Sequence, residues 1–160
     1  MKKASTLFLR AAVLAIGAVI LALCVFALPA TWRAVPGEYS GIAYAFYAIL
    51  LAMYASAIPF FIGLYQALQL LKYIDKNQAF SALSLKALQR ITYCAVAISV
   101  VYTVSMPFFY IWAEKDDAPG LIIVGMIFVG ASLTVAVFAA VLQRLFRQGL
   151  DMKSENDLTV

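Results

Sequence analysis

Four long runs without a charged residue divide this chain of 160 residues, at positions 11–32, 39–71, 91–113 and 118–143. Each run exceeds the roughly 20 residues that a helix needs to cross a bilayer. Charged residues make up 12% of the chain, about half their share in soluble domains, so the apolar surface must face lipid. We predict an all-α polytopic membrane protein, a single domain (residues 1–160) of four transmembrane helices in a bundle. The expected helices cover about residues 7–31, 41–72, 85–112 and 119–148.

The basic residues are distributed unevenly between the two sides of these runs. Ten of the twelve stand before the first run, between the second and third, or after the fourth. Only Arg33 and Lys115 stand on the opposite side. Because segments rich in Lys and Arg stay in the cytoplasm, we expect both termini, the loop at 73–84 and the tail at 149–160 to be cytoplasmic. Since these charges serve topology, we expect no direct nucleic-acid binding.

The sequence offers few groups that could carry out chemistry. It contains no histidine, and its eight carboxylates all lie outside the four runs. Histidines or paired cysteines are usual in metal, haem and acid–base sites, and ion-coupled transporters normally keep a charged residue within their spans. We therefore expect no enzymatic activity, no catalytic residue, no cofactor and no metal.

Polar and aromatic residues form one stripe on the second expected helix and one on the third. Helical spacing places the members of each stripe on one face. The stripes consist of Tyr47, Tyr54 and Tyr65 on the second helix, and Ser99, Tyr102, Thr103 and Tyr110 on the third. Two interpretations stay open: the stripes face each other and form hydrogen bonds across the interface, or they enclose a pocket for an amphiphile. In the first case Tyr54 would lie near Thr103.

The loop and the tail carry the candidate partner-binding residues. Asn77 is typical of a turn, Ser81 of a helix N-cap, and Phe80 of the residue before such a cap. The polar tail is either disordered or a short peptide that a partner or the protein's own cytoplasmic face captures. The candidate residues are Asp75, Asn77, Gln78, Phe80, Ser81, Glu155, Asn156, Asp157, Leu158 and Val160.

Two segments of the chain resemble motifs of a known bacterial family. They are the loop segment at 73–88, which reads YIDKNQAFSALSLKAL, and the closing segment at 155–160, which reads ENDLTV. The family is the uncharacterised membrane family known as domain of unknown function 2975. The resemblance implies a four-helix protein of the bacterial inner membrane, and members are often encoded beside a small helix-turn-helix regulator. It implies no activity and no catalytic residues.

These observations favour a non-enzymatic regulatory or interaction protein that contacts a cytoplasmic partner, such as a small helix-turn-helix regulator. One alternative is a transporter or channel component, which would need to assemble as a homo-oligomer because four helices are few for a pore. Another is a membrane protein that binds a lipid or another amphiphile.

Overall fold

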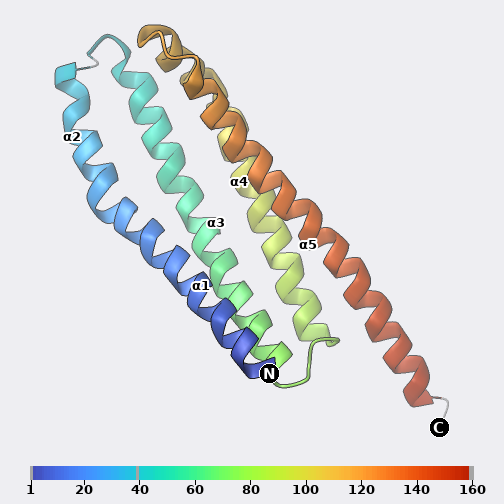
Figure 1. Ribbon diagram of the computed structural model, residues 1–160. Coiled ribbons are helices and arrows are strands. Elements are labelled where there is room, and N and C mark those ends of the chain that lie inside the picture. The colour runs from blue at the N-terminus through green and yellow to red at the C-terminus, as the bar shows by residue number, and fades with distance from the viewer. Residues whose placement is uncertain (1, 39, 159–160) are drawn as a thin grey trace.

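The computed structural model describes residues 2–38 and 40–158, and the described part is helical apart from two short turns (Figure 1). The helices lie side by side, and the two ends of the chain lie at the same end of the bundle as the turn between α3 and α4. The elements are α1 (Lys2–Ala22), the π-helix η1 (Leu23–Ala27), α2 (Leu28–Glu38), the 3-10 helix η2 (Ser40–Ile42), α3 (Ala43–Asp75), α4 (Ala82–Lys115) and α5 (Gly120–Leu158).

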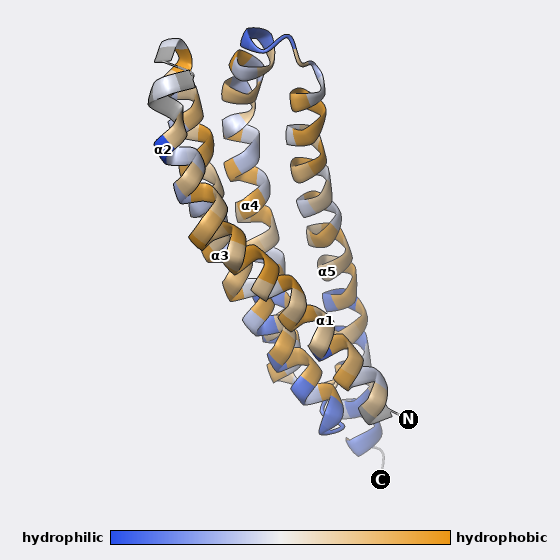
Figure 2. Cartoon of the chain, turned by 60° about the vertical axis from the view of Figure 1, so that its left-hand side comes forward, coloured by the Kyte–Doolittle hydropathy of each residue, from blue (hydrophilic) through white to orange (hydrophobic). Residues whose placement is uncertain are grey.

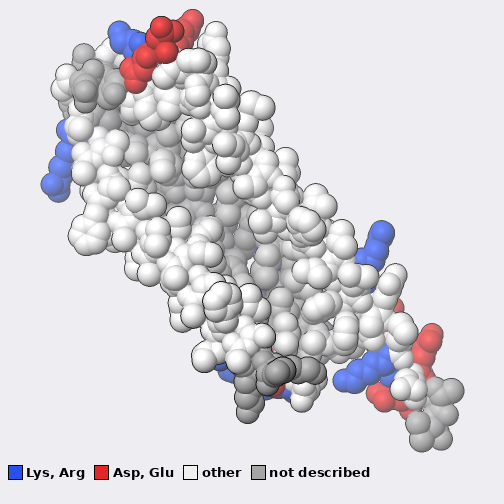
Figure 3. Space-filling model, viewed as in Figure 1, with Lys and Arg blue, Asp and Glu red and all other residues white. Residues whose placement is uncertain are grey.

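Four stretches are long and apolar enough to cross a membrane: Ala4–Ala34, which joins α1, η1 and most of α2, then α3, α4 and α5. Hydrophobic residues fill the middle of the helices, and hydrophilic ones gather at the turn between α4 and α5 and at the opposite end (Figure 2). On the face shown in Figure 3, the charged side chains lie toward the two ends of the molecule. The prediction of an all-α protein with four spanning helices is confirmed.

The helices pack in chain order: α1 and α2 contact α3, α3 contacts α4, and α4 contacts α5. Small residues are buried along these interfaces, and they let helix backbones approach closely in a membrane. They include Ala45, Ala87, Ala95, Gly125, Ala136 and Ala139. Larger side chains fill two apolar clusters, one around Phe46, Leu50 and Leu28 and one around Ile49, Tyr102 and Phe109. Many of the other apolar side chains are exposed, as lipid contact requires.

The first spanning stretch changes its helical pattern at η1. The backbone N–H of Leu28 donates to the carbonyl of Leu23, five residues earlier. The next donor in that pattern would be residue 29, which is Pro29 and has no N–H. The carbonyl of Cys24 therefore loses a helical partner, and the hydroxyl of Tyr54 on α3 donates to it instead, at 3.1 Å. A neighbouring helix thus satisfies a backbone group that proline frees within the membrane.

The two sharp turns share one helix-ending geometry. Asn77 and Asp117 have positive φ values of 59° and 49°. In each turn the following residue donates its N–H to a carbonyl five residues earlier, from Gln78 to Tyr73 at 2.8 Å and from Ala118 to Ala113 at 2.9 Å. This is the Schellman pattern, in which a residue in the left-handed region ends a helix.

The helices are longer than we predicted. The first stretch begins at Lys2 and ends at Glu38, and α4 begins at Ala82. The largest difference is in α5, which we expected to end near 148 and which continues to Leu158. The expected loop 73–84 shrinks to residues 76–81. These differences have one physical cause: a helix does not need to end where the bilayer ends, and it continues into water until a cap or a turn stops it.

Candidate functional site at the loop between α3 and α4

Hydrogen bonds hold the loop at 76–81 in a fixed shape. Ser81 caps α4, because its Oγ accepts from the N–H of Ser84 at 3.3 Å. The hydroxyls of Ser81 and Ser84 both donate to the carbonyl of Gln78, at 2.7 and 2.9 Å. Ser84 is fully buried. The predicted cap at Ser81 is therefore confirmed, and these bonds fix the direction in which Phe80 leaves the loop.

Phe80 joins the loop to α5. Its ring lies edge-on to the ring of Phe146, with 5.3 Å between the ring centroids. One turn further along α5, the ring covers Gly149 so closely that a Cβ there would lie 2.6 Å from Cε1 of Phe80. Only glycine leaves room for this contact. The loop therefore rests directly on the backbone of α5.

A groove opens beside this contact. It has a volume of about 580 Å³, and Phe80 lines it together with the last turns of α5. We call it the loop–tail groove, and it is lined by Phe80, Met152, Lys153, Glu155 and Asn156. Phe80 remains 47% exposed and Met152 68% exposed. The groove thus combines two exposed apolar side chains, Phe80 and Met152, with polar and charged ones, a composition that suits a peptide or a helix of a second protein.

Asp75 lies outside the groove and ties the first helix to α3. Its Oδ2 is 3.0 Å from an Nη atom of Arg10 on α1. Its other carboxylate oxygen, Oδ1, is buried and has no hydrogen-bond partner within the described part of the chain. The pair therefore has a structural role at the end of the bundle that holds the loop.

The structure brings together only some of the predicted partner-binding residues. Phe80, Glu155 and Asn156 line the groove, whereas Asn77, Gln78 and Ser81 shape the turn. Asp157 and Leu158 are exposed at the end of α5, and Val160 lies outside the described residues. Sequence reasoning missed Met152, Lys153, Phe146 and Gly149. For three of them a signal was available in principle, because Phe146, Gly149 and Met152 follow one another at a spacing of three residues, which keeps them near one helix face.

The two intramembrane stripes do not lie face to face, which was one of the two interpretations that the sequence left open. Tyr54 bonds to the first spanning stretch instead of lying near Thr103, and the ring of Tyr47 packs at a tilt against Trp32 of α2, with 4.6 Å between the ring centroids. Thr103 donates to the carbonyl of Ser99 in its own helix, at 2.7 Å, while Tyr65 and Tyr110 are exposed. The reason is the packing order: α3 contacts the first spanning stretch as well as α4, and Tyr47 and Tyr54 both point to the first stretch.

Other polar pairs join the helices inside the membrane. Tyr102 and Ser56 share a buried hydrogen bond of 3.0 Å between α4 and α3. Ser99 donates to Ser132 of α5 at 2.8 Å. Gln143 of α5 donates to Thr92 Oγ1 of α4 at 2.6 Å. The sequence analysis did not identify four of these residues, Ser56, Thr92, Ser132 and Gln143. They are isolated hydroxyls and one amide, and they form no stripe along a helix.

Comparison with known proteins agrees with the fold. A family described as "Protein of unknown function (DUF2975)" matches residues 33–160. The chain is 60% identical over 105 residues to the "Uncharacterized membrane protein YoaS" of Bacillus subtilis (strain 168), a match that covers 66% of each chain and so just under two thirds of that relative. No solved structure matches the chain. The resemblance seen in the sequence is thereby confirmed, and this four-helix membrane protein belongs to the DUF2975 family.

Proposed function

We propose that this chain is a non-enzymatic regulatory or interaction protein of the bacterial inner membrane, and that its loop–tail groove binds a cytoplasmic partner. The observation that carries the proposal is the position of Phe80, which is fixed on α5 yet still half exposed. A rigid apolar side chain at the edge of a groove is a common anchor for a partner.

Exposed apolar residues beyond the membrane support the same function. The α5 extension leaves Met152 68% exposed and Leu158 84% exposed. The ten basic residues at this end of the bundle predict, by the positive-inside rule, that it faces the cytoplasm. Large apolar side chains grouped on a water-facing surface are typical of an interaction site. Lys153, Glu155 and Asp157 would surround the contact with charges of both signs.

The partner class that we favour is a small soluble helix-turn-helix regulator, as the family resemblance implies. Such a protein could present an amphipathic helix to the groove, where Phe80 and Met152 would meet its apolar face. Holding a DNA-binding protein at the membrane would keep it from its sites. This function needs no catalytic residue and no cofactor.

Affinity purification of the full chain in mild detergent, followed by mass spectrometry, tests the proposal. We expect a helix-turn-helix protein to be recovered with the full chain and lost with Met152→Glu and with a chain that ends at Gly149. Ser154→Glu is the matched control, because it adds the same charge to the same exposed helix two residues away, on the opposite face. Equal recovery of the regulator with Met152→Glu, or no recovery with the unchanged protein, would refute the proposal.

A further inference from the structure

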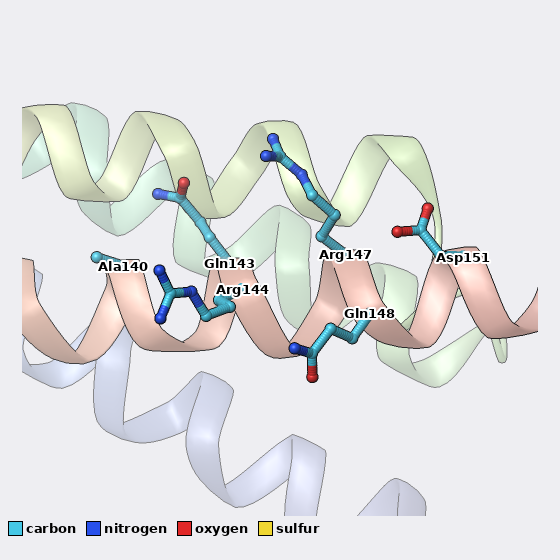
Figure 4. A pocket seen from close by; sticks show the side chains of 6 residues that line it. All are labelled: Ala140, Gln143, Arg144, Arg147, Gln148 and Asp151. Atoms are coloured by element: carbon cyan, nitrogen blue, oxygen red, sulfur yellow. The ribbon is translucent and has the colours of Figure 1, made fainter.

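A second cavity lies along α5, nearer to the membrane than the loop–tail groove and lined by different residues (Figure 4). Its volume is about 470 Å³, and it is an open hollow, because all six residues that line it belong to the single helix α5. The lining residues form two rows at four-residue spacing. One row is Gln143, Arg147 and Asp151, and the other is Ala140, Arg144 and Gln148.

The cavity spans the boundary between lipid and water. Arg144 is the first charged residue after the uncharged run at 118–143, so its guanidinium marks the depth of the lipid headgroups. Ala140 lies one turn deeper and leaves space beneath Arg144. Val137 and Leu133 are exposed on the same face of α5, one and two turns deeper than Ala140, so acyl chains can lie against this face.

The two arginines of the cavity, Arg144 and Arg147, are available to a ligand. Within the described part of the chain, the only ion pair joins Arg10 and Asp75, and Arg144 and Arg147 make no hydrogen bond. Gln143 is fixed by its bond to Thr92 on α4, which holds this stretch of α5 in place. Two unpaired guanidinium groups on a fixed helix are suited to a phosphate, which they bind by charge-assisted hydrogen bonds.

The order of groups along α5 matches the order of groups in a phospholipid. From the membrane outward the cavity offers an apolar residue, two cations and then one carboxylate: Ala140, Arg144 with Arg147, and Asp151. A phospholipid with a polyol headgroup presents acyl chains, a phosphate and then hydroxyls. We propose that this cavity binds an anionic phospholipid of that kind, with Arg144 and Arg147 on the phosphate and Asp151 accepting from a headgroup hydroxyl.

The site would have a role beyond the topology signal that any cytoplasmic arginine supplies. A lipid seated there would hold the last membrane turn of α5 at a fixed depth. The helix extension that carries the loop–tail groove begins only one turn later. Lys86 and Arg90, both exposed on the facing end of α4, would add to the positive potential that attracts anionic lipid.

Native mass spectrometry of the full chain in mild detergent tests this proposal. Phosphatidylglycerol and phosphatidylcholine with identical acyl chains are the probes, and we expect tighter retention of phosphatidylglycerol. Arg144→Gln with Arg147→Gln should weaken that retention by roughly fivefold for each arginine. Arg33→Gln, an exposed arginine at the opposite end of the bundle, is the matched control and should leave it unchanged. Arg144→Lys with Arg147→Lys keeps both charges and should retain most of the preference.

Three results would overturn the proposal. They are equal retention of the two lipids by the unchanged protein, an unaltered preference in the double glutamine variant, and an equal loss in Arg33→Gln. Inorganic phosphate is added as a competitor, to test whether the site binds a soluble anion and not a lipid. We expect it to leave the lipid bound, and its displacing phosphatidylglycerol would mean that the site takes free phosphate instead. Asp151→Asn should reduce the preference for phosphatidylglycerol over phosphatidic acid, which has no headgroup hydroxyl.

Discussion

The hydroxyl of Tyr54 donates a 3.1 Å hydrogen bond to the carbonyl oxygen of Cys24, across the interface between α3 and the first spanning stretch. The acceptor lies in the π-helix η1, five residues before Pro29. Because proline has no N–H, this side-chain donor replaces the one that the helix lacks. The bond therefore couples the position of α3 to a backbone irregularity in its neighbour.

Replacing Tyr54 by phenylalanine should destabilise the protein by about 1 kcal/mol, since interhelical hydrogen bonds in membranes contribute about that much. Pro29→Ala supplies an N–H for the same stretch. Tyr54→Phe should therefore cost much less stability in a Pro29→Ala background than in the unchanged protein. Thermal unfolding in detergent measures both differences. Tyr65→Phe is the control, because Tyr65 is exposed and makes no hydrogen bond within the described part of the chain. An equal cost of Tyr54→Phe with and without Pro29 would show that the missing donor is not the reason for the bond.

Gly149→Ala should not bring the gain in stability that this substitution brings at an ordinary helix glycine. Gly→Ala in a helix normally stabilises by about 0.5–1 kcal/mol. At Gly149 a Cβ would meet the ring of Phe80 at 2.6 Å or closer, so the ring and its loop must move. We expect Gly149→Ala to bring no gain in stability and to speed hydrogen exchange in the loop at 76–81.

Gly130 provides the matched control for this substitution. It lies in the same helix, and a Cβ there would meet nothing within 4 Å, so Gly130→Ala should give the ordinary gain. Removing the ring should restore the gain at Gly149, which makes Gly149→Ala stabilising in a Phe80→Ala background. If Gly149→Ala stabilised the unchanged protein as much as Gly130→Ala does, the contact between Phe80 and α5 would be too loose to matter.

The sequence predicts the spans and the cap at Ser81 because both depend on local information. A run of uncharged residues defines a span by itself, and a serine before a helix satisfies a backbone N–H within three residues. The site depends instead on contacts between distant segments. Phe80 meets Gly149 only because α4 packs against α5, and no local pattern in the sequence predicts that these two helices are neighbours at this depth.

The tail shows a second limit of local reasoning. Its polar and acidic end, Glu155 to Leu158, is helical, although its composition alone also fits a disordered tail. Once α5 has formed in the membrane, each added residue extends an existing helix without the cost of a new nucleus. Helix propagation from the membrane thus explains what the composition of the segment could not.

The pair of Arg10 and Asp75 should show a marked asymmetry between single and double substitutions. The two groups lie 3.0 Å apart, and the carboxylate has one buried oxygen without a partner. Removing only the arginine leaves a partly buried carboxylate uncompensated, which costs more than removing both charges. We expect Arg10→Gln to lower stability by about 1 kcal/mol, since the pair is still partly open to solvent, and Arg10→Gln with Asp75→Asn to recover most of that loss. Additive effects of the two substitutions in thermal unfolding would show that the two groups do not interact.

The helical extension of α5 gives the most direct test of the loop–tail groove. Ser154→Pro removes the backbone N–H that bonds to residue 150 and places a ring against that turn, so the helix should end before Glu155 and Asn156. The residues from Asp151 to Leu158 are all exposed, and the melting temperature of the membrane part should therefore stay unchanged. Amide hydrogen exchange should rise after residue 153 only. If the groove binds its partner with α5 as one wall, Ser154→Pro should reduce recovery of the partner as strongly as removal of residues 150–160, whereas Ser154→Ala, which keeps the helix, should not. Full partner recovery with a broken helix would mean that the tail acts as a flexible peptide, and that Phe80 and α5 do not form the binding surface together.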